Sequence, residues 1–108
     1  MTQKMLDVHP ITPQLFNAVS KLNRWNFSRF NKGQAVQKHS HKFDAMYFVN
    51  GVKEVCSGGS RIALPEFAAV FIPKGAEHGW NGIASGKTEA VVGHFHDGHG
   101  VHEVVPEY

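Results

Sequence analysis

The stretch DAMYFVNGVKEVCSGGSRIAL, residues 44–64, alternates apolar runs with glycine-containing turns. Residues 44–49 and 52–56 are rich in β-branched and aromatic side chains, which favour strands. Asn50-Gly51 between them is typical of a type I′ hairpin turn, because both central residues of that turn need a positive φ. Gly58-Gly59 predicts a second turn, which leads into a strand over residues 61–64. The stretch therefore predicts three short antiparallel strands.

Short strands continue on both sides of this stretch. We expect them at residues 24–30, 33–43, 68–72 and 88–96. Strands at this spacing predict an all-β fold with little helix, a small antiparallel barrel or sandwich of six to ten strands. Residues 14–22 have apolar side chains near helical spacing, with Thr12 as a candidate N-cap before Pro13. They form either one short helix or an irregular strand.

Length and composition indicate one soluble domain. The chain has 108 residues and 42% hydrophobic residues, enough for one modest core. No apolar stretch approaches the roughly 20 residues of a membrane span, and the N-terminus lacks the apolar run of a signal peptide. We therefore expect a cytoplasmic protein with no membrane partner. The single Cys56 fits this expectation, since it cannot form an internal disulfide.

The net charge of +2 is unevenly distributed. Residues 1–61 contain nine lysines and arginines against three acids, and residues 62–108 contain two against six. The basic residues are scattered singly and form no run. They predict a solvated face of a sheet rather than a nucleic-acid-binding surface.

Two histidines, His39 and His41, stand just before the apolar run. Residues at i and i+2 of a strand point to the same side of the sheet. If that side is the interior, an imidazole there is costly unless something binds it, and a metal ion is the obvious candidate. His78 follows a turn at Pro73–Gly75, and the hairpins in between can bring it beside the pair.

These residues resemble the two sequence motifs of the cupin superfamily. The first motif, G-x5-H-x-H-x3,4-E-x6-G, is similar to the segment with Gly33, His39, His41 and Gly51. The second, G-x5-P-x-G-x2-H-x3-N, is similar to the segment with Pro73, Gly75 and His78. HSHKFDAMYFVNG also resembles the ligand-sensing barrel of arabinose-regulator-type transcription factors. The resemblance covers residues 24–96 and implies an antiparallel double-stranded β-helix, a jelly-roll barrel.

The cupin resemblance also implies a metal site made of the motif histidines, the motif glutamate and the second-motif histidine. Here Ala45 and Met46 stand where the glutamate is expected. Asp44 is the nearest acid, but on an unbroken strand it points away from the histidines, and a bulge is needed to turn it inward. The candidate ligands are therefore His39, His41 and His78, with Asp44 as a candidate fourth.

Three neutral imidazoles bind zinc, iron, nickel, copper or manganese and leave positions open for water or ligand. The donor set favours no single divalent metal. The alternative is a cupin that has lost its metal and keeps the histidines as hydrogen-bonding groups in its cavity.

Further candidates for ligand binding are histidines and aromatic residues near the expected cavity. His94 and His96 share one face of the strand over residues 88–96. They reach the cavity if that face is inward, where either can supply a fourth ligand, and are surface histidines if it is outward. Phe43, Tyr47 and Trp80 either line the pocket or are plain core.

The expected function is binding of a divalent metal and a small polar or anionic ligand in the barrel. The alternatives are a metal-dependent cupin enzyme of the dioxygenase, isomerase or decarboxylase type, and a metal-free structural or interaction protein. No acid/base pair supports the enzyme, because Lys53, Glu54 and Glu66 have the pattern of turn or surface charges.

The expected organisation is a single domain with an N-terminal extension over residues 1–22, a barrel over 24–96 and a tail over 97–108. The extension has more apolar side chains than a free tail should carry, among them Leu6 and Val8. We expect them to be buried in a two-fold symmetric homodimer. The alternative is that the extension folds back over its own barrel.

Overall fold

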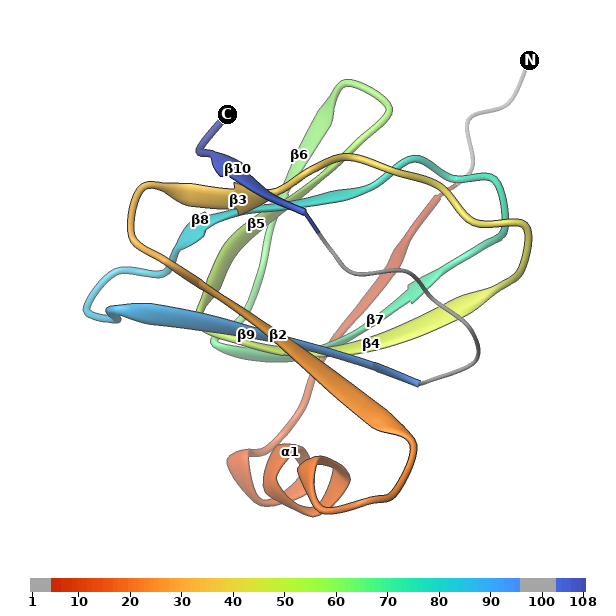
Figure 1. The fold of residues 1–108 in the computed structure, drawn as a ribbon. Helices are drawn as coiled ribbons and strands as arrows, with labels where there is room; N and C mark the ends of the chain where they lie inside the picture. Colours follow the sequence, from red (N-terminus) through yellow and green to blue (C-terminus); the bar gives the residue numbers. More distant parts are fainter. Residues whose placement is uncertain (1–4, 96–102) are drawn as a thin grey trace.

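The computed structural model describes residues 5–95 and 103–108, which form two facing β-sheets and one short helix (Figure 1). From edge to edge, the first sheet has β1 (Asp7–Pro10), β7 (Phe67–Ile72), β4 (Ala45–Asn50), β9 (Glu89–Phe95) and β2 (Trp25–Asn31). The second sheet has β10 (Val104–Pro106), β3 (Gln34–Val36), β8 (Gly79–Ile83), β5 (Val52–Ser57) and β6 (Ser60–Ala63).

The strand pairing confirms the all-β prediction. Neighbouring strands of both sheets pair antiparallel along the described chain. Within the described residues, 5–95 and 103–108, no ladder of hydrogen-bonded strands joins the first sheet to the second. The architecture is therefore two five-stranded layers, without the closure that a barrel requires.

The core lies between the two layers. On β4 the side chains of Ala45, Tyr47 and Val49 are buried, whereas those between them are more exposed. This alternation is the period of two that a strand with one buried face requires. Val70 of the neighbouring β7 and Trp80 of β8 in the facing sheet are fully buried in the same cluster.

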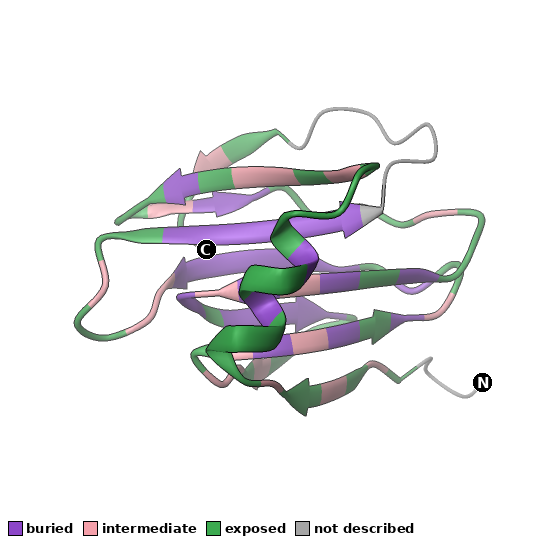
Figure 2. Cartoon of the chain, turned by 90° about the horizontal axis from the view of Figure 1, so that it is seen from below, coloured by how far each residue is buried: buried purple, intermediate pink, exposed green. Residues whose placement is uncertain are grey.

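Residues Pro13–Ser20 form α1, so the helical alternative for this segment is correct. Thr12 is the N-cap, and its Oγ1 accepts a hydrogen bond of 3.1 Å from the backbone N–H of Leu15. The helix lies across the outer face of the first sheet (Figure 2). Its buried Phe16 makes edge contacts with the rings of Phe27 and Phe67. No helix in the described part of the chain is long and apolar enough to cross a membrane.

The type I′ hairpin predicted at Asn50-Gly51 is wrong. β4 belongs to the first sheet and β5 to the second, so this dipeptide is a corner between the layers. Gly51 has a φ of 78°, whereas Asn50 is not among the residues with positive φ. The second predicted turn, at Gly58-Gly59, is a two-residue hairpin turn, because both φ values are positive and Ser57 pairs with Ser60.

We predict that Gly51→Ala lowers the free energy of unfolding more than Gly33→Ala does. Both glycines have a positive φ, so both variants carry a conformational cost of about 1–2 kcal/mol. A Cβ at Gly51 would also stand 2.8 Å from the carbonyl oxygen of Glu89, whereas one at Gly33 meets nothing within 4 Å. Overpacking of this kind adds about 1–3 kcal/mol. Urea unfolding measures the difference, and equal losses would contradict the corner described here.

The N-terminal extension folds back onto its own chain. β1 pairs with β7, and the half-buried Leu6 and Val8 pack against the core. At the other end, β10 in the tail pairs with β3 as an edge strand of the second sheet. Much of the apolar surface that motivated the homodimer is thus covered within one chain, and the homodimer itself stays a prediction.

Candidate metal centre

Backbone hydrogen bonds join the two histidine-bearing segments. His39 and His78 form an isolated antiparallel bridge, in which each backbone N–H donates to the other's carbonyl at 2.9 and 2.8 Å. The N–H of Gly75 donates to the carbonyl of His41 at 2.8 Å. Regular pairing of β3 ends at Val36, so the strand predicted over residues 33–43 is shorter than expected. The bridge nevertheless fixes the relative positions of the histidines.

The side chains of His39, His41 and His78 converge as predicted. One ring nitrogen from each lies within 4.8 Å of the others. The ring centroids of His39 and His41 are 4.7 Å apart, and those of His39 and His78 are 4.3 Å apart. His78 is fully buried, while the other two are half-buried. The cluster therefore lies where the interior meets solvent, and an ion can reach it.

Two of these histidines are oriented by backbone carbonyls. Nδ1 of His39 lies 2.9 Å from the carbonyl oxygen of Gln37, and Nδ1 of His78 lies 3.1 Å from that of Ala76. A carbonyl oxygen only accepts, so each Nδ1 carries the proton and donates it. Each Nε2 then presents a lone pair, the form in which a neutral imidazole binds a metal. The donor chemistry of the cluster thus fits a transition-metal ion.

The hydroxyl of Tyr47 lies at the same place. Its Oη is 2.9 Å from Nε2 of His41 and 3.4 Å from Nε2 of His78. Tyr47 was predicted as a pocket or core residue, and it is fully buried while its hydroxyl meets the histidines.

Asp44 is not part of the cluster. The structure leaves it exposed, and its Oδ1 accepts a hydrogen bond of 2.9 Å from the backbone N–H of Lys74. Its position one residue before the inward-facing Ala45 gives it the outward direction expected from strand parity. Through this hydrogen bond, Asp44 instead stabilises the turn that leads to His78.

His94 faces inward on β9 and is 4% exposed, so the surface alternative is wrong for this residue. Its ring centroid is 5.8 Å from that of Tyr47, but it is not a member of the histidine group that could share an ion. The prediction for His96 lies outside the described residues.

Phe43 and Trp80 flank the cluster from two sides. The ring of Phe43 stacks on His41, with centroids 5.0 Å apart, and 36% of this residue is exposed. Trp80 is fully buried, and its ring centroid lies 5.0 Å from that of Tyr47. No acceptor among the described residues reaches the buried Nε1 of Trp80. A buried donor without an acceptor costs about 1–3 kcal/mol, so this atom suits contact with a water or a ligand oxygen.

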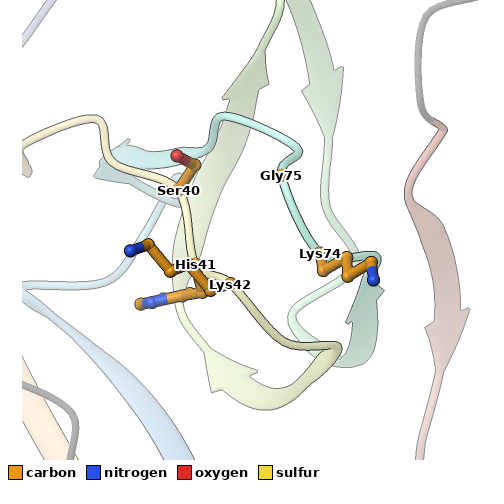
Figure 3. A pocket seen from close by; sticks show the side chains of 5 residues that line it. All are labelled: Ser40, His41, Lys42, Lys74 and Gly75. Carbon is orange, nitrogen blue, oxygen red and sulfur yellow. The ribbon is translucent and has the colours of Figure 1, made fainter.

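A cavity of about 480 Å³ opens beside His41. One segment contributes Ser40, His41 and Lys42 to its wall, and the facing segment contributes Lys74 and Gly75 (Figure 3). The two lysines were not among the predicted site residues. The position of Lys74 between Pro73 and Gly75 of the second motif is the signal that could have identified it.

A second polar cluster lies around Glu54, where the prediction of a turn or surface charge is wrong. Glu54 is 9% exposed, and its Oε2 accepts hydrogen bonds of 2.6 Å from both Arg61 and Asn81. Burial by itself raises the pKa of this carboxyl, but the hydrogen bonds from Asn81 and Arg61 outweigh it and hold the pKa below its usual value. Burial also raises the pKa of the neighbouring Cys56 thiol.

We predict that Glu54 makes the fold sensitive to acid. A carboxyl whose pKa is lower in the folded state contributes stability above its unfolded pKa and loses it as the pH falls through the folded pKa. The urea midpoint of the wild-type chain should therefore fall between neutral pH and a pH below 4.5, the usual value for this group. Glu54→Gln should reduce this pH dependence, and the exposed Glu103→Gln should not. An unchanged pH dependence in Glu54→Gln would contradict the assignment.

Comparison with protein-family models, with curated proteins and with solved structures finds no match to this chain.

Proposed function

We propose that this protein binds a divalent metal ion through His39, His41 and His78. The observation that carries the proposal is the convergence of one ring nitrogen from each histidine within 4.8 Å. The carbonyl partners of His39 and His78 add support, because they orient two of the rings with Nε2 available to an ion. Zinc, iron, nickel and manganese are all compatible with three imidazoles.

The order of the strands supports a cupin-type double-stranded β-helix as the scaffold. Without the edge strands β1 and β10, the first sheet has the order β2-β9-β4-β7 and the second has β3-β8-β5-β6. This alternation of eight antiparallel strands between two layers is the one expected of a jelly roll. The segments similar to the two cupin motifs meet at the bridge between His39 and His78.

The ligand that we propose beside the metal is a small anion such as a carboxylate. The cavity next to His41 has Lys42 and Lys74 in its wall, and ammonium groups attract anions. The cavity wall has two cationic side chains. One carboxylate lies next to it, because Asp44 accepts a hydrogen bond from the backbone N–H of Lys74.

A binding role is favoured over catalysis. Among the described residues, the group that could share an ion contains three histidines and no carboxylate. A base that removes a proton from a metal-bound substrate must lie within hydrogen-bonding reach of it, and no acid in this group offers one. Cytoplasmic location and the lack of a nucleic-acid partner stay predictions.

The metal proposal is tested by titrating Zn²⁺ against a chelating dye. We expect one tight site in the wild-type chain, its loss in His39→Ala, and its retention in the control His9→Ala, since His9 is exposed and outside the cluster. Equal affinity in all three proteins would refute the site.

The anion proposal is tested on the zinc-loaded protein with oxalate as the probe. Lys74→Gln should weaken oxalate binding several-fold, because it removes one cationic group from the cavity wall. Lys32→Gln is the matched control, since Lys32 is exposed and does not line the cavity. Calorimetry measures both, and identical oxalate affinities would refute the role of the cavity.

A further inference from the structure

The hydroxyl of Tyr47 lies between two of the proposed ligands. Its Oη is 2.9 Å from Nε2 of His41 and 3.4 Å from Nε2 of His78, and Tyr47 and His78 are both fully buried. A single hydroxyl hydrogen can be donated to only one nitrogen at a time. Since Nδ1 of His78 donates to the carbonyl of Ala76, Nε2 of His78 is an acceptor facing this oxygen. Two ring nitrogens and one oxygen thus converge on one small volume.

The position of Tyr47 on β4 explains how an oxygen comes to this place. Ala45 stands where the cupin resemblance calls for a glutamate, and its short side chain is buried. Tyr47 is the next inward-facing residue of the same strand, one pleat further along. Its longer side chain carries an oxygen back to the histidines, while Asp44 is held outside by Lys74. The site therefore has an oxygen donor from β4 that is not a carboxylate.

We propose that Tyr47 is the fourth protein ligand of the metal site, in place of the missing glutamate. This inference rests on the metal function proposed above. On coordination, a lone pair of the phenolic oxygen binds the ion, the O–H bond breaks and the proton passes to solvent. Tyrosine oxygen is an established ligand of protein-bound iron, so a site of three imidazoles and one phenolate is chemically competent.

The experiment uses Fe³⁺, supplied as its nitrilotriacetate complex, as a spectroscopic probe. Tyr47 and Tyr108 are the only tyrosines in the chain. A visible phenolate-to-iron charge-transfer band should appear in the wild-type protein and in Tyr108→Phe, and be absent from Tyr47→Phe. In addition, Tyr47→Phe should weaken Zn²⁺ binding by about tenfold or more. The band reports direct ligation, which a merely structural tyrosine would not produce.

The outcomes separate this inference from the metal function. If Tyr108→Phe binds Fe³⁺ without the band, Tyr47 is not a ligand while the histidine site stands. If Tyr47→Phe folds and keeps wild-type zinc affinity, the inference is also overturned. If the wild-type chain binds neither ion, the metal function fails and the inference fails with it. Because Tyr108→Phe retains Tyr47, this arm gives an answer even if Tyr47→Phe does not fold.

Discussion

Zinc at a concentration of 100 times its dissociation constant should stabilise the wild-type chain against unfolding by about 2.7 kcal/mol. The ion binds the folded state, in which His39, His41 and His78 converge. In an unfolded chain His78 lies far from the other two, because more than thirty residues separate it from His41. For a domain of this size, such a gain raises the melting temperature by roughly 10–20 °C. Differential scanning calorimetry with and without zinc measures it.

His78→Ala should lose nearly all of this zinc-dependent stabilisation. His78 is the buried member of the cluster and bridges to His39 through its backbone, so its loss leaves two half-buried imidazoles. The variant also has a cavity in its core, which lowers its stability without zinc. The relevant quantity is therefore the difference between the zinc and zinc-free scans of each protein. His9→Ala is the control, and a His78→Ala shift equal to that of the wild type would contradict the site.

Trp80→Ala should lower the free energy of unfolding by about 3–5 kcal/mol, the largest loss expected from a single core truncation here. Trp80 is 0% exposed and packs against the rings of Tyr47 and His78. Removing it leaves a cavity between the two sheets beside the proposed ligands. Zinc affinity should fall as well, because Tyr47 and His78 lose a packing partner.

Trp25→Ala is the matched control for Trp80→Ala. The chain has two tryptophans, and Trp25 is half-buried at the end of β2, in edge contact with Phe48. Its truncation should be less costly and should leave zinc affinity unchanged. Urea unfolding of both variants gives the comparison, and similar losses would show that Trp80 is not part of the central packing.

Local sequence patterns predict several of the strands, because a strand with one buried face has a period of two. The buried Tyr47 and Val49 alternate with more exposed neighbours, and this alternation is visible in the sequence itself. The helix start is equally local, since Thr12 and Pro13 are adjacent to the turn that they cap. Such features depend on residues within a few positions of one another.

Turn chemistry does not reveal which sheet the next strand joins. Asn50-Gly51 and Gly58-Gly59 both favour tight turns, but only the second connects paired strands. At Gly51 the chain instead passes close to the carbonyl oxygen of Glu89, nearly forty residues away. That contact is set by the packing of the two layers, which a local dipeptide cannot encode.

The burial of Glu54 could not be predicted from local sequence patterns either. One of its hydrogen-bond partners, Asn81, comes from β8 and is 27 positions away along the chain. Asn81 also accepts a hydrogen bond of 2.8 Å from the backbone N–H of Tyr108. A charged residue on a strand has the same local sequence pattern whether or not such partners cover it.

The cluster of histidines could be predicted because the spacing of the histidines within the two motifs is visible in the sequence. His39 and His41 are two positions apart, and the Pro73–Gly75 turn places His78 just before β8. The oxygen that lies beside the histidines is not that of Asp44, because strand position alone does not give the reach of a side chain. Asp44 is closer to the histidines in sequence, but the longer Tyr47 side chain brings an oxygen to them.

The most direct measurement is elemental analysis of the protein purified without a nickel column. We expect about one equivalent of a transition metal in the wild-type chain and in His9→Ala. We expect almost none in the variant that combines His39→Ala, His41→Ala and His78→Ala. Equal metal content in all three proteins, or none in the wild type even after incubation with zinc, iron, nickel and manganese salts, would contradict the central claim.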